Sequence, residues 1–198
     1  MISRRTARLR SVLVGIYALI AVPAQAGEPA TAWDERSRAL ADQLMSELQA
    51  ELKQSMQQGG PVAAIEVCRT RAPQIASRLS ASAGADVGRT AMRVRNPANA
   101  PDDLERAVMQ SFAAVLATAS PPASVPPEAV VEFRSAQGIE RRYLRAIPMQ
   151  PVCLTCHGVT LAPEVAAAID RDYPQDAATG FESGQLRGAV TVRWPATR

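Results

Sequence analysis

Histidine and lysine are almost absent from this chain of 198 residues, which contains one histidine, His157, and one lysine, Lys53. A single imidazole excludes a site with two histidine ligands, and it argues against catalysis by a second histidine acting as general acid or base. With one lysine, the positive charge belongs almost entirely to arginine, whose planar guanidinium suits carboxylates. Internal repeats and low-complexity tracts are also absent, which favours one domain over an array of repeats.

A long apolar run is missing too, because none reaches the roughly 20 residues that a membrane-spanning helix requires. The run SVLVGIYALIAV (11–22) follows the basic segment MISRRTARLR and precedes the small residues of PAQA (23–26). This order is typical of a Sec-type signal peptide cleaved after Ala26, with a retained signal anchor as the alternative. We therefore expect residues 1–26 to be a signal peptide. The mature chain is expected to be periplasmic or secreted, without a stable membrane span.

The mature chain also lacks an excess of positive charge. The full sequence has 22 basic and 19 acidic residues, and four of the arginines lie within 1–26. After cleavage, 22 less 4 leaves 18 basic residues against 19 acidic ones, a formal net charge of −1. This balance does not favour nucleic acid or an anionic membrane as a partner.

Residues 27–198 are expected to form a single domain that begins with helices. Five apolar residues recur at every fourth position of 33–58 and predict a long amphipathic helix: Leu40, Leu44, Leu48, Leu52 and Met56. Gly59 and Gly60 end this helix. A second helix is expected to start at Pro61 and to kink or restart at Pro73.

The rest of the chain predicts mainly strands. The expected elements are a strand at 87–96, a helix at 102–117 opened by the capping-box pair Asp102 and Glu105, a hairpin of strands 129–135 and 139–147, a short helix from Pro163, and a strand at 186–194. Helices followed by strands favour the α+β class, with an antiparallel sheet flanked by helices.

The segment CLTCH (153–157) has the C-x-x-C-H spacing by which c-type haem is attached. Cys153 and Cys156 lie one helical turn apart, so both sulfurs face the two vinyl groups of one haem. His157 follows directly and is placed to bind the iron. Thioether attachment takes place outside the cytoplasm, in agreement with the expected signal peptide. The pattern predicts one haem c, covalently bound through Cys153 and Cys156.

Two other kinds of site compete for these residues. A zinc ion could take Cys68, Cys153, Cys156 and His157 as ligands, but an adjacent cysteine and histidine reach one tetrahedral ion awkwardly. A thiol redox centre requires C-x-x-C near the start of a helix in a thioredoxin-like βαβ unit, which this neighbourhood does not supply. Haem c is therefore the preferred interpretation.

The second axial ligand must come from earlier in the chain, because no methionine, histidine or lysine follows His157. Cys68 is a candidate, since a third cysteine without a disulfide partner in an oxidising compartment is buried, reactive or bound to a metal. The other candidates are methionines: Met45, Met56, Met92, Met109 and Met149. The residues alone leave this choice open.

Four stretches carry a resemblance to a known family: AIEVCRTRAPQIA (64–76), RVRNPANAPDDLE (93–105), RRYLRAIPMQPVCLTCHG (141–158) and YPQDAATGFESGQLRGAVTV (173–192). In this order they resemble a family of bacterial c-type haem domains with a PAS-like fold. Its members occur alone after a signal peptide or as the sensing part of membrane sensors. The resemblance implies a helix-flanked antiparallel sheet, one haem, and axial ligation by a histidine and a cysteine. Here these ligands fall on His157 and Cys68.

These features predict a sensor of redox state or of a small ligand such as a diatomic gas, with a redox or signalling protein as partner. In such a sensor Cys68 leaves the iron on reduction and opens a binding position. The alternative is a periplasmic electron-transfer cytochrome, whereas the lack of a second histidine disfavours a haem enzyme acting on peroxide. Arg95 is expected at a haem propionate, with the alternative that the loop that carries it simply caps the edge of the sheet. Tyr143 is expected in the haem pocket or in the core.

Overall fold

The computed structural model describes residues 30–118 and 125–197. The expected signal peptide, residues 1–26, lies outside these ranges. Among the helices that the structure describes, none combines the length and the apolar character needed to cross a membrane.

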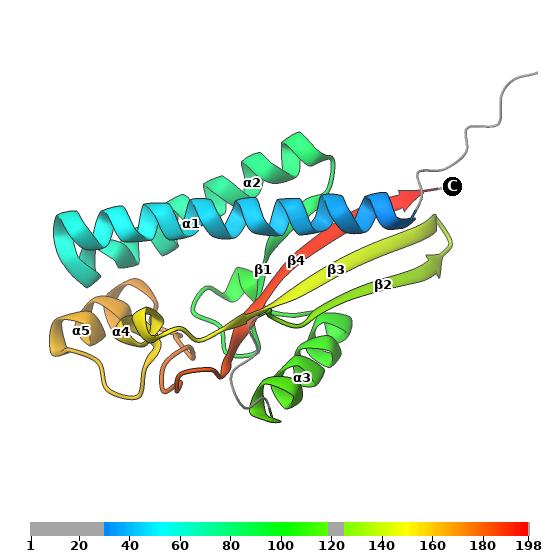
Figure 1. Ribbon diagram of the computed structural model, residues 1–198. Helices are drawn as coiled ribbons and strands as arrows, with labels where there is room; N and C mark the ends of the chain where they lie inside the picture. Colours follow the sequence, from blue (N-terminus) through cyan, green and yellow to red (C-terminus); the bar gives the residue numbers. More distant parts are fainter. Residues whose placement is uncertain (1–29, 119–124, 198) are drawn as a thin grey trace, which may run out of the picture.

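A four-stranded antiparallel sheet with strand order β1-β4-β3-β2 forms the centre of the fold (Figure 1). Its strands are β1 (Asp86–Thr90), β2 (Glu128–Ser135), β3 (Gly138–Pro148) and β4 (Leu186–Thr197). The predicted hairpin and C-terminal strand are confirmed. β1 is shorter than the predicted strand 87–96, because the chain then leaves the sheet and the Ala91 amide donates to the Asn99 carbonyl at 3.1 Å. The 3-10 turn η2 (Pro97–Asn99) lies in this segment outside the sheet.

Three helical segments in succession cover one face of the sheet (Figure 1). α1 (Ala30–Glu66) bends at Gly60, whose φ of 70° lies in the left-handed region that glycine adopts readily. A π-helical turn, η1 (Val67–Arg71), joins α1 to α2 (Ala72–Ala83), and Pro73 occupies the first turn of α2. The break at the glycine pair and the restart at Pro73 are thus confirmed.

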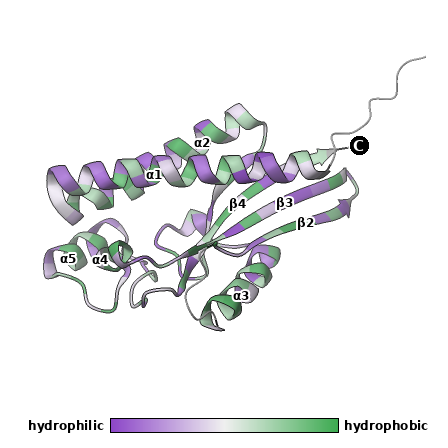
Figure 2. Cartoon of the chain, in the orientation of Figure 1, coloured by the Kyte–Doolittle hydropathy of each residue, from purple (hydrophilic) through white to green (hydrophobic). Residues whose placement is uncertain are grey.

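The first core lies between these helices and the sheet. Leu44 and Leu48 of the predicted apolar stripe are buried in it, and Figure 2 shows hydrophobic and hydrophilic residues alternating along α1. The other large members are Ile75, Leu79, Val87, Tyr143, Val190, Val192 and Trp194. Leu52 and Met56, farther along the stripe, are only half-buried, because this half of α1 extends beyond the sheet (Figure 1).

α3 (Asp103–Thr118) covers the opposite face of the sheet. The predicted capping box is present: the Glu105 amide donates to Asp102 Oδ1 at 2.9 Å, and the Asp102 amide donates to Glu105 Oε2 at 3.2 Å. The fully buried Glu105 carboxylate also accepts from Thr191 Oγ1 at 2.9 Å and from Arg193 Nη2 at 2.6 Å. Apolar side chains complete this second core: Met109, Phe112, Leu144 and Leu186.

After β3 the chain forms a lobe at one end of the sheet, beneath the far half of α1 (Figure 1). The lobe contains η3 (Pro151–Cys153), α4 (Leu154–His157) and α5 (Pro163–Asp172), the last being the helix predicted from Pro163. An apolar cluster joins α5 to α1: Val62, Ile65, Val165, Ala168 and Ile169. The antiparallel sheet with helices on both faces confirms the α+β class.

Candidate functional site

The CLTCH motif forms one tight turn of the lobe. Cys153 ends η3 and Cys156 lies in α4, so the two thiols are one turn apart. Both are half-buried and free of disulfide bonds. The Gly158 amide closes the turn by donating to the Leu154 carbonyl at 2.9 Å. A Cβ atom at Gly158 would stand 2.5 Å from that oxygen, so the turn requires glycine directly after the histidine.

His157 is held in one tautomer by the chain itself. Its Nδ1 lies 2.6 Å from the Ala178 carbonyl oxygen. Because a carbonyl only accepts hydrogen bonds, Nδ1 carries the proton and Nε2 keeps its lone pair. Burial, followed by the positive charges of Arg187 and Arg95, lowers the pKa of His157 to about 3. The imidazole is therefore neutral at neutral pH, with Nε2 in the state that binds a metal.

The segment 173–182 fixes the position of this imidazole. The Phe181 amide donates to the His157 carbonyl at 2.9 Å, and the Gly180 amide donates to the Gly158 carbonyl at 2.8 Å. The Phe181 ring meets the imidazole edge-on, with ring centroids 6.5 Å apart and an angle of 87° between the planes. Both the backbone and the ring of His157 are thus held by contacts with one segment.

Arg95 clamps this segment to the motif and is only 7 % exposed. Its Nε and Nη2 donate to the two carboxylate oxygens of Asp176 at 3.0 and 3.2 Å, and Nη2 also donates to the Cys156 carbonyl at 2.7 Å. These contacts give Arg95 a structural role that the sequence did not predict, whereas its expected propionate contact stays a prediction. Tyr143 lies in the first core and its hydroxyl donates to Glu128 Oε2 at 2.8 Å, in agreement with the core alternative.

Cys68 lies on the π-helical turn η1 and is half-buried, without a disulfide bond. The pKa of Cys156 is raised mainly by burial, and the charge of Cys68 raises it further. Burial is the main cause of the raised pKa of Tyr173, and the charge of Cys68 is the second cause. Burial is also the main cause of the lowered pKa of Arg187, and the charge of Cys68 acts in the opposite direction, against this larger effect. Because such interactions fall off with distance, they agree with a Cys68 thiol in the neighbourhood of Cys156, Tyr173 and Arg187. π-Helical turns occur frequently at functional sites.

Two comparisons place this geometry among known proteins. A model of the Tll0287-like family matches residues 27–195. The chain belongs to the Tll0287-like family. The crystal structure of the cyanobacterial haem protein Tll0287 matches with a TM-score of 0.61 and 22 % identity, over 86 % of this chain and 99 % of that one, which shows a shared fold. A search of curated proteins gave no match. Membership of the Tll0287-like family confirms the resemblance carried by the four sequence stretches.

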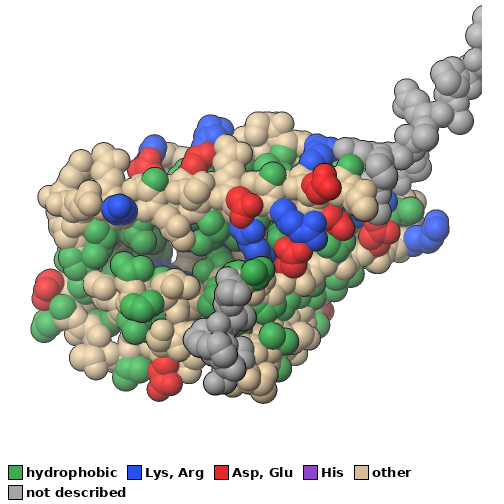
Figure 3. Space-filling model, in the orientation of Figure 1, with side chains coloured by type: hydrophobic (Ala, Val, Ile, Leu, Met, Phe, Trp, Pro, Cys, Tyr) green, Lys and Arg blue, Asp and Glu red, His purple; other side chains and the backbone are tan. Residues whose placement is uncertain are grey.

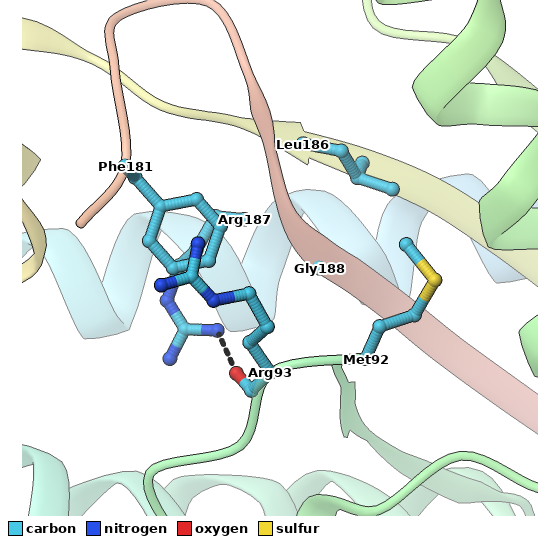
Figure 4. A pocket seen from close by; sticks show the side chains of 6 residues that line it. All are labelled: Met92, Arg93, Phe181, Leu186, Arg187 and Gly188. Carbon is cyan, nitrogen blue, oxygen red and sulfur yellow. Dashed lines mark hydrogen bonds between the residues drawn. The ribbon is translucent and has the colours of Figure 1, made fainter. Parts of the chain in front are cut away.

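This Tll0287-like chain is hollowed between α1 and the lobe, and hydrophobic side chains surround the opening (Figure 3). A small pocket of the chain is lined by Met92, Arg93, Phe181, Leu186, Arg187 and Gly188 (Figure 4). From this pocket, Arg187 Nε reaches to 3.5 Å from His157 Nε2, and Arg187 Nη1 donates to the Arg93 carbonyl at 3.2 Å. Sequence reasoning missed Arg187, because an arginine in a strand gives no sign of the residue that it faces.

The alternative ligand sets find less support in the Tll0287-like structure. Within 30–118 and 125–197, no group of three or more His, Cys, Asp and Glu side chains is arranged to hold a metal ion, so the zinc alternative has no geometric basis there. Met109 is buried on the α3 face, and Met149 packs against Ala178 and Phe181. Met45 packs against the first core and Met56 is half-buried. Met92 lines the pocket and is 39 % exposed, so it stays a candidate ligand.

Proposed function

We propose that this chain is a periplasmic protein that binds one haem c through Cys153 and Cys156, with His157 Nε2 and Cys68 Sγ as axial ligands. The state of His157 is the observation that carries the proposal. Its Nδ1 is committed to the Ala178 carbonyl, so that Nε2 keeps a lone pair next to two free thiols. The relative of known structure is a haem protein, and an opening with apolar walls (Figure 3) suits a porphyrin.

The residues of the site have distinct roles in holding the cofactor. Each thiol adds across one vinyl group: the sulfur bonds to one vinyl carbon and the thiol hydrogen passes to the other, so no oxidant is consumed. His157 binds on one side of the porphyrin, and its hydrogen bond to Ala178 keeps the ring oriented. The haem supplies an iron that exchanges one electron and binds diatomic gases where an axial position is open.

Cys68 determines what the site does once it is assembled. A thiolate is an anionic donor that favours ferric over ferrous iron, so its bond weakens on reduction. Cys68 lies on a single π-helical turn between two α-helices, a local irregularity of the backbone hydrogen bonds. Its release opens a position for a diatomic gas and makes the protein a redox or gas sensor that signals to a protein partner.

The covalent link is tested with the double variant Cys153→Ala/Cys156→Ala, which is expected to lose all covalent haem. Each single variant is expected to keep one thioether bond. The full chain is produced in a host that matures c-type haem, and the haem remaining on the polypeptide is measured after denaturation and solvent extraction. Thr155→Ala, at the exposed position between the cysteines, is the control and retains its haem. Wild-type protein that releases its haem on denaturation contradicts the link, and wild-type protein without haem contradicts the function.

One observation favours the alternative role of electron carrier. Val152 and Val159 flank the motif and are 60 % and 71 % exposed. Exposed apolar side chains at one place on a surface are typical of protein–protein contacts. They would provide a docking surface for a redox partner next to the attachment site.

Binding of carbon monoxide to the ferrous protein distinguishes the sensor from the electron carrier. If Cys68 leaves on reduction, ferrous wild-type protein binds carbon monoxide rapidly, and we expect this outcome. The measurement is stopped-flow absorbance of the dithionite-reduced protein. A ferrous protein that keeps both axial ligands and stays inert to carbon monoxide supports the electron carrier instead.

A further inference from the structure

Four arginine side chains gather around His157, and among the residues that the structure describes three of them lack an acidic partner. They are Arg89, Arg93, Arg95 and Arg187. Arg187 Nε lies 3.5 Å from His157 Nε2, and Arg95 donates to the carbonyl of the adjacent Cys156 at 2.7 Å. The charge of Arg89 acts on the imidazole as well. Asp176 is the acid that faces the group, and both of its oxygens accept from Arg95. The remaining arginines must therefore find other partners.

Arg93 is satisfied by its neighbours. Its guanidinium lies over the Phe181 ring, 4.2 Å from the centroid, and its Nε donates to the Ala177 carbonyl at 3.0 Å. Among the described residues, Arg187 has only neutral partners: the Arg93 carbonyl at 3.2 Å, His157 Nε2 at 3.5 Å, and the Phe181 ring, whose centroid is 5.7 Å from its guanidinium carbon. Figure 4 shows the guanidinium groups of Arg93 and Arg187 close together beside Phe181.

Arg89 extends from the strand next to that of Arg187. It shares a face of β1 with Val87, whose side chain is buried in the first core beneath α1 and α2. The strand register sets Arg89 opposite Val190 of β4, three residues after Arg187. Among residues 30–118 and 125–197, Arg89 has no hydrogen-bond or ion-pair partner. The guanidinium groups of Arg89 and Arg187 therefore lie at the end of the sheet near the lobe, and neither has an acidic partner among the described residues.

Holding these charges without an anion is unfavourable. Withdrawing a cation from water costs free energy unless an opposite charge accompanies it. A bound carboxylate removes this cost, because its two oxygens match the donors of a guanidinium fork.

We propose that Arg89 and Arg187 form a carboxylate-binding site next to His157, and that the propionate groups of the haem occupy it. This inference rests on the proposed haem site. Arg187 Nε stands at His157 Nε2, the atom assigned to the iron, so the guanidinium must turn aside when that atom binds the metal. The propionates are the carboxylates that arrive with the same ligand, and they give both arginines an anionic partner.

The test compares haem-bearing wild-type protein with Arg187→Gln and Arg89→Gln. Resonance Raman spectra report the propionate bending mode, which shifts to lower frequency when a propionate loses hydrogen bonds. We expect this shift in both variants, together with a lower reduction potential, because removing a positive charge near the iron favours the ferric state. Arg106→Gln, at an exposed position of α3 on the other face of the sheet, is the matched control and leaves both readouts unchanged.

The possible results distinguish the carboxylate site from the haem proposal on which it rests. Unchanged propionate bands and potentials in both variants overturn the carboxylate site while leaving the haem proposal intact, and wild-type protein without haem refutes the haem proposal itself. If Arg187→Gln fails to fold, Arg187→Lys replaces it: the lysine keeps the charge but loses the fork, so the Raman shift is expected with a smaller change in potential. Acetate added to wild-type holoprotein is expected to change nothing. A shift with acetate that disappears in Arg187→Gln or Arg187→Lys assigns the site to a free carboxylate and overturns the propionate assignment.

Discussion

Cys68→Ala is expected to abolish the low-spin thiolate signature of the ferric protein while the haem stays covalently attached through Cys153 and Cys156. The reason is that, in the proposed site, Cys68 is the thiol supplied by another part of the fold, whereas the proposed thioether bonds take up the two motif thiols. Loss of an anionic ligand destabilises ferric iron. We expect the reduction potential to rise by about 0.2 V, within the roughly 0.8 V that axial ligands span. Absorbance, electron paramagnetic resonance and a redox titration measure these changes.

Two further substitutions sharpen this test. Cys68→Met places a neutral thioether on the same turn, so the iron is expected to remain low-spin with a raised potential and without the thiolate signature. Met92→Leu removes the exposed methionine that lines the pocket and is expected to leave the ferric spectrum unchanged. An unchanged spectrum in Cys68→Ala, together with a changed one in Met92→Leu, would transfer the ligand role from Cys68 to Met92.

Features encoded by neighbouring residues were predictable from the sequence. The four-residue apolar spacing located α1, and the pair Asp102 and Glu105 marked the start of α3, since their reciprocal bonds join residues three positions apart. The spacing of Cys153, Cys156 and His157 predicted one tight turn for the same reason, and the attachment chemistry that it indicates stays a prediction. Each of these patterns reflects the period of a helix or the geometry of one turn.

Features that depend on the return of distant chain segments were not predictable. The pairing of Arg95 with Asp176 was not predicted, because Asp176 is 81 positions away and reaches Arg95 only when segment 173–182 folds back over the motif. The π-helical turn at Cys68 was also missed, because the sequence there resembles an ordinary helix until Pro73 restarts it. The contact of Arg187 with His157 likewise depends on how β4 enters the sheet.

The clamp made by Arg95 has the largest expected effect on stability. Both members of its pair are almost fully buried, with side-chain exposures of 6 % for Arg95 and 7 % for Asp176. Arg95→Met leaves the Asp176 carboxylate buried without its partner and removes the donor to the Cys156 carbonyl. Breaking one side of a buried ion pair costs about 3–5 kcal/mol. We expect a loss of this size in the free energy of unfolding of the full chain, measured by urea denaturation.

The loss in the free energy of unfolding should depend on the burial of the ion pair and not merely on its presence. Arg171→Met is the matched control, because it breaks the exposed Arg171–Asp172 pair, and exposed pairs contribute little to stability. The double variant Arg95→Met/Asp176→Leu tests the mechanism, since replacing both buried charges with apolar groups is often close to neutral. Its expected recovery of most of the lost stability identifies the unpaired carboxylate as the cause. A double variant as unstable as Arg95→Met would instead assign the loss to hydrogen bonds: the bond from Arg95 to the Cys156 carbonyl and, in the double variant, also the bond from the Ala178 amide to Asp176. In that case Arg95 would act mainly by holding the haem-attachment turn to segment 173–182, and covalent haem would fall in both variants together.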